Sequence, residues 1–115
     1  MQISVYKTSG GKDIISGGNY SPEGKAKILK ILKTIKSDGI DRFITRFVNK
    51  NSTPKLLEIK RDRVRVFFFK IHEEMYITHI VENKQKNKTE LTDKELATNR
   101  IEHMINNPDQ HVRRL

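Results

Sequence analysis

Residues 55–82, KLLEIKRDRVRVFFFKIHEEMYITHIVE, determine the predicted fold, because β-branched and aromatic side chains recur there with a period of two. The pattern predicts three strands and two short turns. The strands are Lys55–Lys60, Arg63–Ile71 and Met75–Glu82, and the turns are Arg61-Asp62 and His72-Glu73-Glu74. Three strands joined by turns this short form an antiparallel meander.

The middle strand of this meander has two unlike faces. Successive side chains of a strand point to opposite sides of the sheet. One face is therefore plainly apolar, with Val64, Val66 and Phe68. The other face mixes cations with aromatic rings, with Arg63, Arg65, Phe67 and Phe69. We expect helices to cover the plain apolar face.

Two helices are predicted upstream of the meander. Ser21-Pro22 is typical of a helix start, and apolar residues at helical spacing continue to about Lys36. Gly39 ends this helix. A second helix is predicted from the spacing of Ile40, Phe43, Ile44, Phe47 and Val48, and it ends in the turn-rich segment Asn49–Pro54. Together they would form a helical hairpin.

Both ends of the chain add one predicted element. Gln2–Tyr6 alternates as a short edge strand before a glycine-rich loop, which lacks the GK[ST] sequence of a phosphate-binding loop. Near the other end, Thr92 and Glu95 have the spacing of a capping box and predict a helix that ends at Asn106-Asn107-Pro108. The tail His111–Leu115 is predicted to be frayed.

These elements predict a single α+β domain over residues 1–115. Their order is β-α-α-β-β-β-α, and a chain of 115 residues has the length of one folding unit. No apolar run is long enough to span a bilayer, and no charged leader with an apolar stretch opens the sequence. We therefore expect a cytoplasmic protein without membrane contact.

The net charge of +9 is the first indication of function. The excess of cations lies in residues 1–88, because residues 89–115 hold four basic and five acidic side chains. A basic body favours a polyanionic partner, most simply nucleic acid. The alternative is a lysine-rich surface that serves only solubility. The chain has no cysteine, and its four histidines lack zinc-site spacing, so neither a metal nor another cofactor is expected.

A candidate RNA site lies along the second half of the chain. It combines Lys60, Arg63, Arg65 and Phe67 of the strands with the alternate lysines Lys84, Lys86 and Lys88. Cations bind RNA phosphates and aromatic planes stack on unpaired bases, so an open sheet face suits single-stranded RNA. Two alternatives remain open. One is that the arginines belong to a solvated strand face, and the other is that Phe67 and Phe69 form a second small core under the last helix.

Three segments of the chain resemble a known family. They are Lys55-Leu-Leu-Glu-Ile-Lys60, Arg65-Val-Phe-Phe-Phe69 and Lys84-Gln-Lys-Asn-Lys-Thr89, the last followed by Ala97. In this order the chain resembles the RelE/ParE superfamily of bacterial type II toxins, especially its HigB and phage-derived branch. The resemblance covers about residues 55–100 and implies a small RelE-like fold.

The resemblance also implies a function. Such toxins are ribosome-dependent, metal-independent endoribonucleases that cleave mRNA by attack of a ribose 2′-OH, and a cognate antitoxin, often a helix-turn-helix protein, silences them. By this resemblance Arg65 would clamp a phosphate and Lys60 would orient it or transfer a proton. Lys84 and Lys86 would be further catalytic groups, and Arg63, Phe67 and Lys88 would bind RNA.

Some features depart from the family pattern. Some members carry a tyrosine or a pair of histidines near the last helix, but no tyrosine follows Tyr76 here, and Glu90 replaces a proline. His79 is better interpreted as a packed residue, and His103 and His111 as surface residues, than as catalysts. The general acid and base stay unassigned. Two alternative functions remain: a noncatalytic or degenerate relative that binds nucleic acid or a regulator, and a ParE-like gyrase poison.

Overall fold

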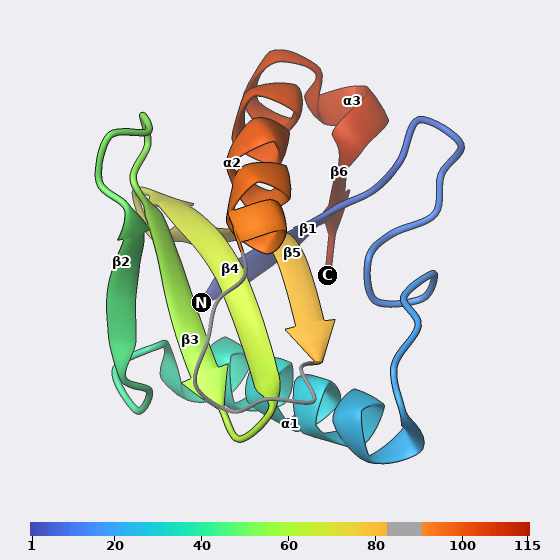
Figure 1. Cartoon of the computed structure of the whole chain (residues 1–115), viewed down its shortest axis with the longest axis vertical. Helices are drawn as coiled ribbons and strands as arrows, with labels where there is room; N and C mark the ends of the chain where they lie inside the picture. The colour runs from blue at the N-terminus through green and yellow to red at the C-terminus, as the bar shows by residue number, and fades with distance from the viewer. Residues whose placement is uncertain (83–90) are drawn as a thin grey trace.

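The computed structural model describes residues 1–82 and 91–115 as one six-stranded sheet between helices (Figure 1). The elements are β1 (Gln2–Tyr6), α1 (Pro22–Asp38), β2 (Thr45–Asn49), β3 (Leu56–Arg61), β4 (Val64–Ile71), β5 (Glu74–Glu82), α2 (Leu91–Asn106), α3 (Pro108–His111) and β6 (Val112–Arg114). The strand order across the sheet is β2-β3-β4-β5-β1-β6. The predicted α+β class is confirmed, and the arrangement fits a small RelE-like fold.

The predicted meander forms the middle of the sheet. β3 pairs with β4 and β4 pairs with β5, both antiparallel. Asp62 and His72 lie in the two connecting turns, and each has a φ of 54°. Asp and His adopt this left-handed conformation more readily than most residues, which allows the strands to reverse in so few residues. The three strands predicted from the period-two pattern are therefore confirmed.

β4 is buried on both faces. Phe68 packs with Ile28, Ile31 and Ile35 of α1 in one core. Phe67 and Phe69 point the other way, into a second core that includes Ala97, Ile101 and Met104 of α2. Burying a phenylalanine ring contributes roughly 1.5–3 kcal/mol, so the three consecutive rings hold one helix on each face of the sheet.

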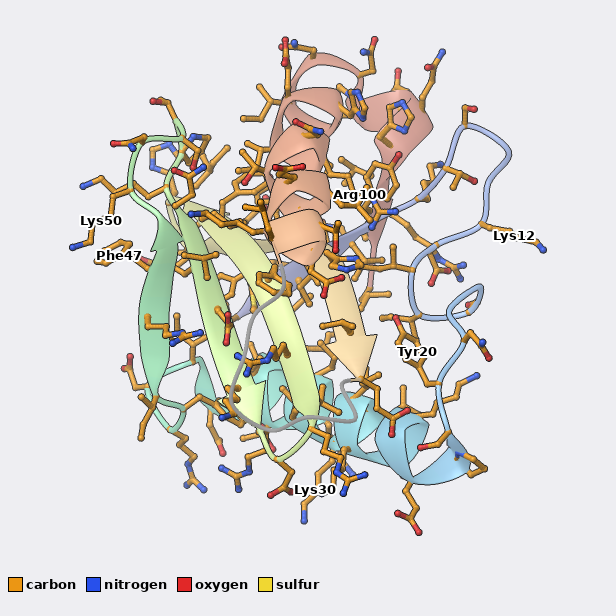
Figure 2. All side chains as sticks on the ribbon, viewed as in Figure 1. Lys12, Tyr20, Lys30, Phe47, Lys50 and Arg100 are labelled. Carbon is orange, nitrogen blue, oxygen red and sulfur yellow. The ribbon has the colours of Figure 1, made fainter. Side chains whose placement is uncertain are left out.

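The helix predicted over residues 40–50 is wrong. Thr45–Asn49 is instead the edge strand β2, which pairs antiparallel with β3. The apolar residues that suggested a helix face are not buried together, because Ile44 is 90% exposed and Phe47 is 50% exposed. Figure 2 shows Phe47 and Lys50 at the outer side of the sheet. Pairing with β3 outweighs the local helical spacing, so α1 alone replaces the predicted helical hairpin.

β1 is an internal strand, not the predicted edge strand. It lies between β5, to which it is parallel, and β6, to which it is antiparallel. The predicted frayed tail is also wrong, because it forms α3 and β6. Arg113 donates to Asp13 at 2.6 Å, and the backbone N–H of Leu115 donates to the carbonyl of Ile3 at 2.9 Å. Local sequence patterns do not indicate contacts between residues so far apart in the chain.

The predicted helix starts have different outcomes. Ser21 caps α1 as predicted, since its hydroxyl accepts a hydrogen bond from Gly24 N–H, and Gly39 follows the helix with a φ of 80°. α2 begins at Leu91, so Thr92 lies inside the first turn and not at the predicted cap. The predicted end at Asn106 is confirmed. No helix in the described parts of the chain is long and apolar enough to cross a membrane.

Hydrogen bonds connect the end of β5 to the start of α1. Glu82 accepts hydrogen bonds from the backbone N–H and the hydroxyl of Ser21, at 2.8 and 2.5 Å. These hydrogen bonds lower the pKa of Glu82. A Cβ at Gly24 would stand 2.4 Å from the Glu82 carboxylate. A residue without a side chain is therefore needed at position 24 as long as Glu82 holds Ser21.

We predict that Gly24→Ala has opposite effects in two backgrounds. With Glu82 present, the new methyl group displaces the carboxylate and weakens its bonds to Ser21, so the free energy of unfolding falls by about 1 kcal/mol. In a Glu82→Ala background the same change raises it by about 0.5–1 kcal/mol, because alanine favours helix over glycine. Thermal unfolding of the four proteins measures both effects, and a change of the same sign in both backgrounds would contradict the proposed contact.

Candidate functional site

A row of polar and aromatic side chains crosses the sheet on the face that α2 packs against. Arg46 of β2 lies opposite Glu58 of β3, Glu58 lies opposite Phe67 of β4, and Phe67 lies opposite His79 of β5. Residues directly opposite each other in adjacent strands project from the same face. The row therefore brings charges from four strands together on one surface.

Lys60 and Arg65 form a second pair on the same face. They lie directly opposite each other on β3 and β4. Lys60 comes two residues after Glu58 on β3, so both project from the same face. We call Arg46, Glu58, Lys60 and Arg65 the sheet-face cluster. Its three cations and one carboxylate give it a net charge of +2, so the cluster attracts anions to this face.

The centre of the sheet-face cluster is a buried ion pair. Arg65 donates to Glu58 at 2.5 Å, and the two side chains are 1% and 0% exposed. Arg46, which is 59% exposed, approaches the same carboxylate at 3.4 Å. A direct phosphate clamp needs an exposed guanidinium, so this arrangement does not support that role for Arg65. Arg65 instead neutralises and positions Glu58, and Glu58 in turn holds Arg46 at the surface.

The other predicted site residues fall into three groups. Lys60 is exposed at the rim of the sheet-face cluster. Arg63 is also exposed, but it lies in the turn before β4 and not in the strand. The catalytic role predicted for Lys84 and Lys86 and the RNA contact predicted for Lys88 lie outside the described residues. The structure thus brings together Lys60 and Arg65, with Arg63 nearby in the chain.

Phe67 belongs to the core. It is 0% exposed and lies in the cluster of apolar residues beneath α2, with its ring stacked against His79 at a centroid distance of 5.7 Å. A base-stacking ring must be accessible, so the predicted RNA contact by Phe67 is not supported. The alternative, a second small core under the last helix, is confirmed.

His79 connects β5 to α2 through both ring nitrogens. Its Nε2 lies 3.0 Å from Asp93 Oδ1, and its Nδ1 lies 3.2 Å from Arg100 Nη1. An arginine can only donate, so Nδ1 accepts, and a neutral ring donates from Nε2 to Asp93. Burial and the charge of Arg100 lower the pKa of His79, and the hydrogen bond to Asp93 opposes them. His79 is therefore held neutral as a packed residue, as predicted.

Arg100 also continues a stack of rings toward the end of the chain. Its guanidinium lies 4.3 Å from the centroid of Tyr6, and Tyr6 stacks on His111 at 5.4 Å. His111 stacks in turn on His103 at 5.3 Å. The two late histidines thus pack α3 against α2, in keeping with the interpretation that they are not catalysts.

A pocket of about 380 Å³ opens beside this network, between the 8–20 loop, β5 and α2. Lys12, Tyr20, His79 and Arg100 are among its lining residues. Figure 2 shows Lys12, Tyr20 and Arg100 on the side of the molecule where this loop passes α2. The Tyr20 hydroxyl donates to the carbonyl of Ile14 at 2.7 Å, and burial raises its pKa to about 12. Tyr20 is therefore a neutral group at physiological pH.

A metal site was not expected from the sequence. Within residues 1–82 and 91–115, no three His, Asp or Glu side chains gather where they could hold a metal ion. The buried polar groups described above pair with one another or with the backbone. Their arrangement favours the binding of anions by the exposed cations.

Comparison with known proteins identifies the family. The family model described as "Phage derived protein Gp49-like (DUF891)" matches residues 19–102. The chain belongs to the Gp49-like family. The searches of curated proteins and of solved structures returned no match.

The Gp49-like match covers most of the candidate site. It includes the strands β2 to β5, the whole sheet-face cluster, and α2 as far as Glu102. Its limits leave out β1 and β6, which complete the sheet. The Gp49-like family is a RelE-like, toxin-like family, so the resemblance found in the sequence is confirmed at this level.

The sequence predictions missed Arg46, Arg100 and Tyr20. Arg46 falls within the helix that was wrongly predicted. The residues Thr45–Asn49 fit equally well a strand whose side chains alternate between two faces. Asp93 and Arg100 are seven residues apart on α2, which is two turns, so a helical projection places them on one face. That spacing indicates that the two side chains can contact a common partner, which is His79. Nothing local indicated that Tyr20 faces β5.

We predict that Arg65→Ala lowers the free energy of unfolding by about 3–5 kcal/mol, because it leaves the Glu58 carboxylate buried without its main partner. Urea titration measures this loss. Arg63→Ala, which removes an exposed arginine two residues earlier, should change stability by less than about 0.5 kcal/mol. Equal stabilities of the two variants would show that the buried pair does not matter for folding.

We predict that His79 makes stability depend on pH below its ordinary pKa of 6.5. The folded-state pKa is lower, so the unfolded chain binds more protons and the free energy of unfolding decreases as the pH falls from about 7.5 to about 5.5. His79→Gln should reduce this decrease, measured by urea titration at both pH values. His72→Asn, in an exposed turn, should keep the wild-type decrease, and an unchanged decrease in His79→Gln would contradict the assignment.

Proposed function

We propose that this protein is the toxin of a type II toxin–antitoxin system and cleaves mRNA on the ribosome, as in the HigB branch of the RelE-like toxins. The single observation that carries the proposal is the sheet-face cluster, in which Lys60 and Arg46 stand at the surface around a buried ion pair. Membership of the Gp49-like family supports the toxin class. The net charge of +9 supports an RNA partner.

The proposed reaction depends on positively charged side chains around the phosphate and does not require a metal ion. A ribose 2′-OH loses its proton and its oxygen attacks the adjacent phosphorus. The bond from phosphorus to the 5′ oxygen breaks, and that oxygen takes up a proton, leaving a 2′,3′-cyclic phosphate and a 5′-OH. Negative charge grows on the phosphoryl oxygens in between, so preorganised cations stabilise the transition state.

The sheet-face cluster supplies those cations in a fixed arrangement. Lys60 and Arg46 would contact the phosphate, and Lys60 remains our candidate for orienting it or transferring a proton. Arg65 would act from beneath by fixing Glu58, which keeps Arg46 in place. Lys84 and Lys86 would add further charge, as the resemblance implies. An ion pair formed before RNA binds avoids reorganisation during the reaction.

The partners follow from this proposal. The substrate would be mRNA in the decoding site, and the protein would act in the cytoplasm. A cognate antitoxin, in this branch usually a helix-turn-helix protein, would neutralise it. Such a protein must be held inactive in growing cells, so a small neighbouring gene that encodes an antitoxin is expected.

Two observations favour a second candidate function. Arg65 is almost completely buried, and no tyrosine follows Tyr76 that could take part in proton transfer. A degenerate toxin that binds RNA or a regulator without cleavage would have these properties. A gyrase poison is a third outcome that the same experiment detects.

We predict that induced expression slows growth and produces transcripts cut within coding regions, with 5′-OH ends. Lys60→Ala and Arg46→Ala should each reduce cleavage by about 100-fold or more, because each removes a cation from the transition state. Sequencing of RNA ends after induction measures the cuts, and circular dichroism confirms that each variant folds.

The control is Lys33→Ala, which removes an exposed cation from α1 without touching the sheet face. It should cleave as the wild type does. Slowed growth with intact transcripts and broken DNA would support gyrase poisoning instead. RNA binding without cleavage would support the noncatalytic alternative.

A further inference from the structure

A second cationic hollow lies on the other face of the sheet, away from the sheet-face cluster. It has a volume of about 690 Å³ and is bounded by α1, the connection from α1 to β2, and the β3–β4 turn. Figure 2 shows Lys30, one of its lining residues, at the lower end of the molecule, well below Arg100. The hollow is therefore separate from the pocket beside His79.

The charge of this hollow is strongly positive. Lys27 and Lys30 come from α1, Arg42 from the α1–β2 connection and Arg61 from the end of β3. With one carboxylate, Asp62, the lining carries a net charge of +3. Cations scattered for solubility would not need to converge from three segments into one concavity, where the field on an anion is strongest.

Two solvent-exposed ion pairs involve these cations, one within the lining and one with Asp38 outside it. Lys27 forms an ion pair with Asp62, which joins α1 to the β3–β4 turn. Arg42 pairs with Asp38 at 3.4 Å. Lys30 lies three residues after Lys27 and therefore on the same side of α1. α1 and the β3–β4 turn are thus in contact at the hollow through Lys27 and Asp62.

An aromatic plane is part of the same hollow. The guanidinium of Arg61 lies 5.6 Å from the centroid of the Phe43 ring, and both residues line the hollow. Phe43 is only partly buried. A ring beside cations is the arrangement that holds an unpaired base next to its phosphate. An inorganic phosphate alone would not use the ring.

We propose that this hollow binds a nucleotide of single-stranded RNA, with phosphates on Lys30 and Arg42 and a base against Phe43 and Arg61. The choice of RNA as the ligand rests on the proposed function. Lys60 and Arg61 are neighbours on β3 and project from opposite faces of the sheet. The sheet-face cluster and the hollow therefore lie on opposite faces, on either side of the β3–β4 turn. RNA that passes over this turn would occupy both faces, and the hollow would hold nucleotides flanking the site of cleavage.

The test is fluorescence anisotropy with a labelled single-stranded 2′-O-methyl RNA, which lacks the attacking hydroxyl. The double variant Lys30→Gln/Arg42→Gln should bind about tenfold more weakly. Its slope of log K against log salt should be about 1.4 smaller, because two phosphate contacts are lost. Phe43→Leu, which keeps an apolar side chain, should bind about fivefold more weakly or worse.

The matched control is Lys33→Gln/Lys36→Gln, which removes two charges from the same helix outside the hollow. It should keep nearly wild-type affinity. Equal losses in the two double variants would overturn the proposal, as would polyglutamate that competes as well as RNA of equal charge. Because the RNA cannot be cleaved, a failure of the nuclease proposal leaves this measurement intact, and growth and RNA-end assays report that failure separately.

Discussion

The burial of β4 on both faces is the constraint on which the rest of the structure depends. Phe68 requires a cover on one side, and Phe67 and Phe69 require one on the other. A strand without a solvent-facing side must lie inside the sheet, with a helix packed on each face. The positions of α1 and α2, and hence of every cation that they place, follow from three consecutive aromatic residues.

Local patterns predicted the meander, the start of α1 and the end of α2, because period and capping act between residues close in the chain. They failed where distant segments meet. Ile44 and Phe47 fit a helical stripe, yet pairing with β3 makes Phe47 part of an exposed edge strand and leaves Ile44 exposed just before it. The strand predicted at β1 is confirmed, but its position inside the sheet depends on pairing with β5 and β6, which are distant in the sequence.

The candidate site was predictable in its location but not in its details. The meander correctly predicts that Lys60 and Arg65 lie close together on neighbouring strands. It cannot reveal that Glu58 would bury the guanidinium of Arg65, because this depends on the register between two strands. A buried ion pair contributes little net stability compared with apolar residues, but it holds charges in one geometry. In this protein it orders the exposed cation of Arg46.

The placement of β1 has a consequence for the folding rate. Ser4 pairs with Tyr76 on one side and with Arg114 on the other, so the β5-β1-β6 side of the sheet joins segments from opposite ends of the sequence. Such a topology has a high relative contact order, and domains of this kind close slowly, often in milliseconds to seconds. Until then the apolar side chains of Ile3 and Val5 remain exposed, and the nascent molecule is vulnerable to aggregation and to proteases.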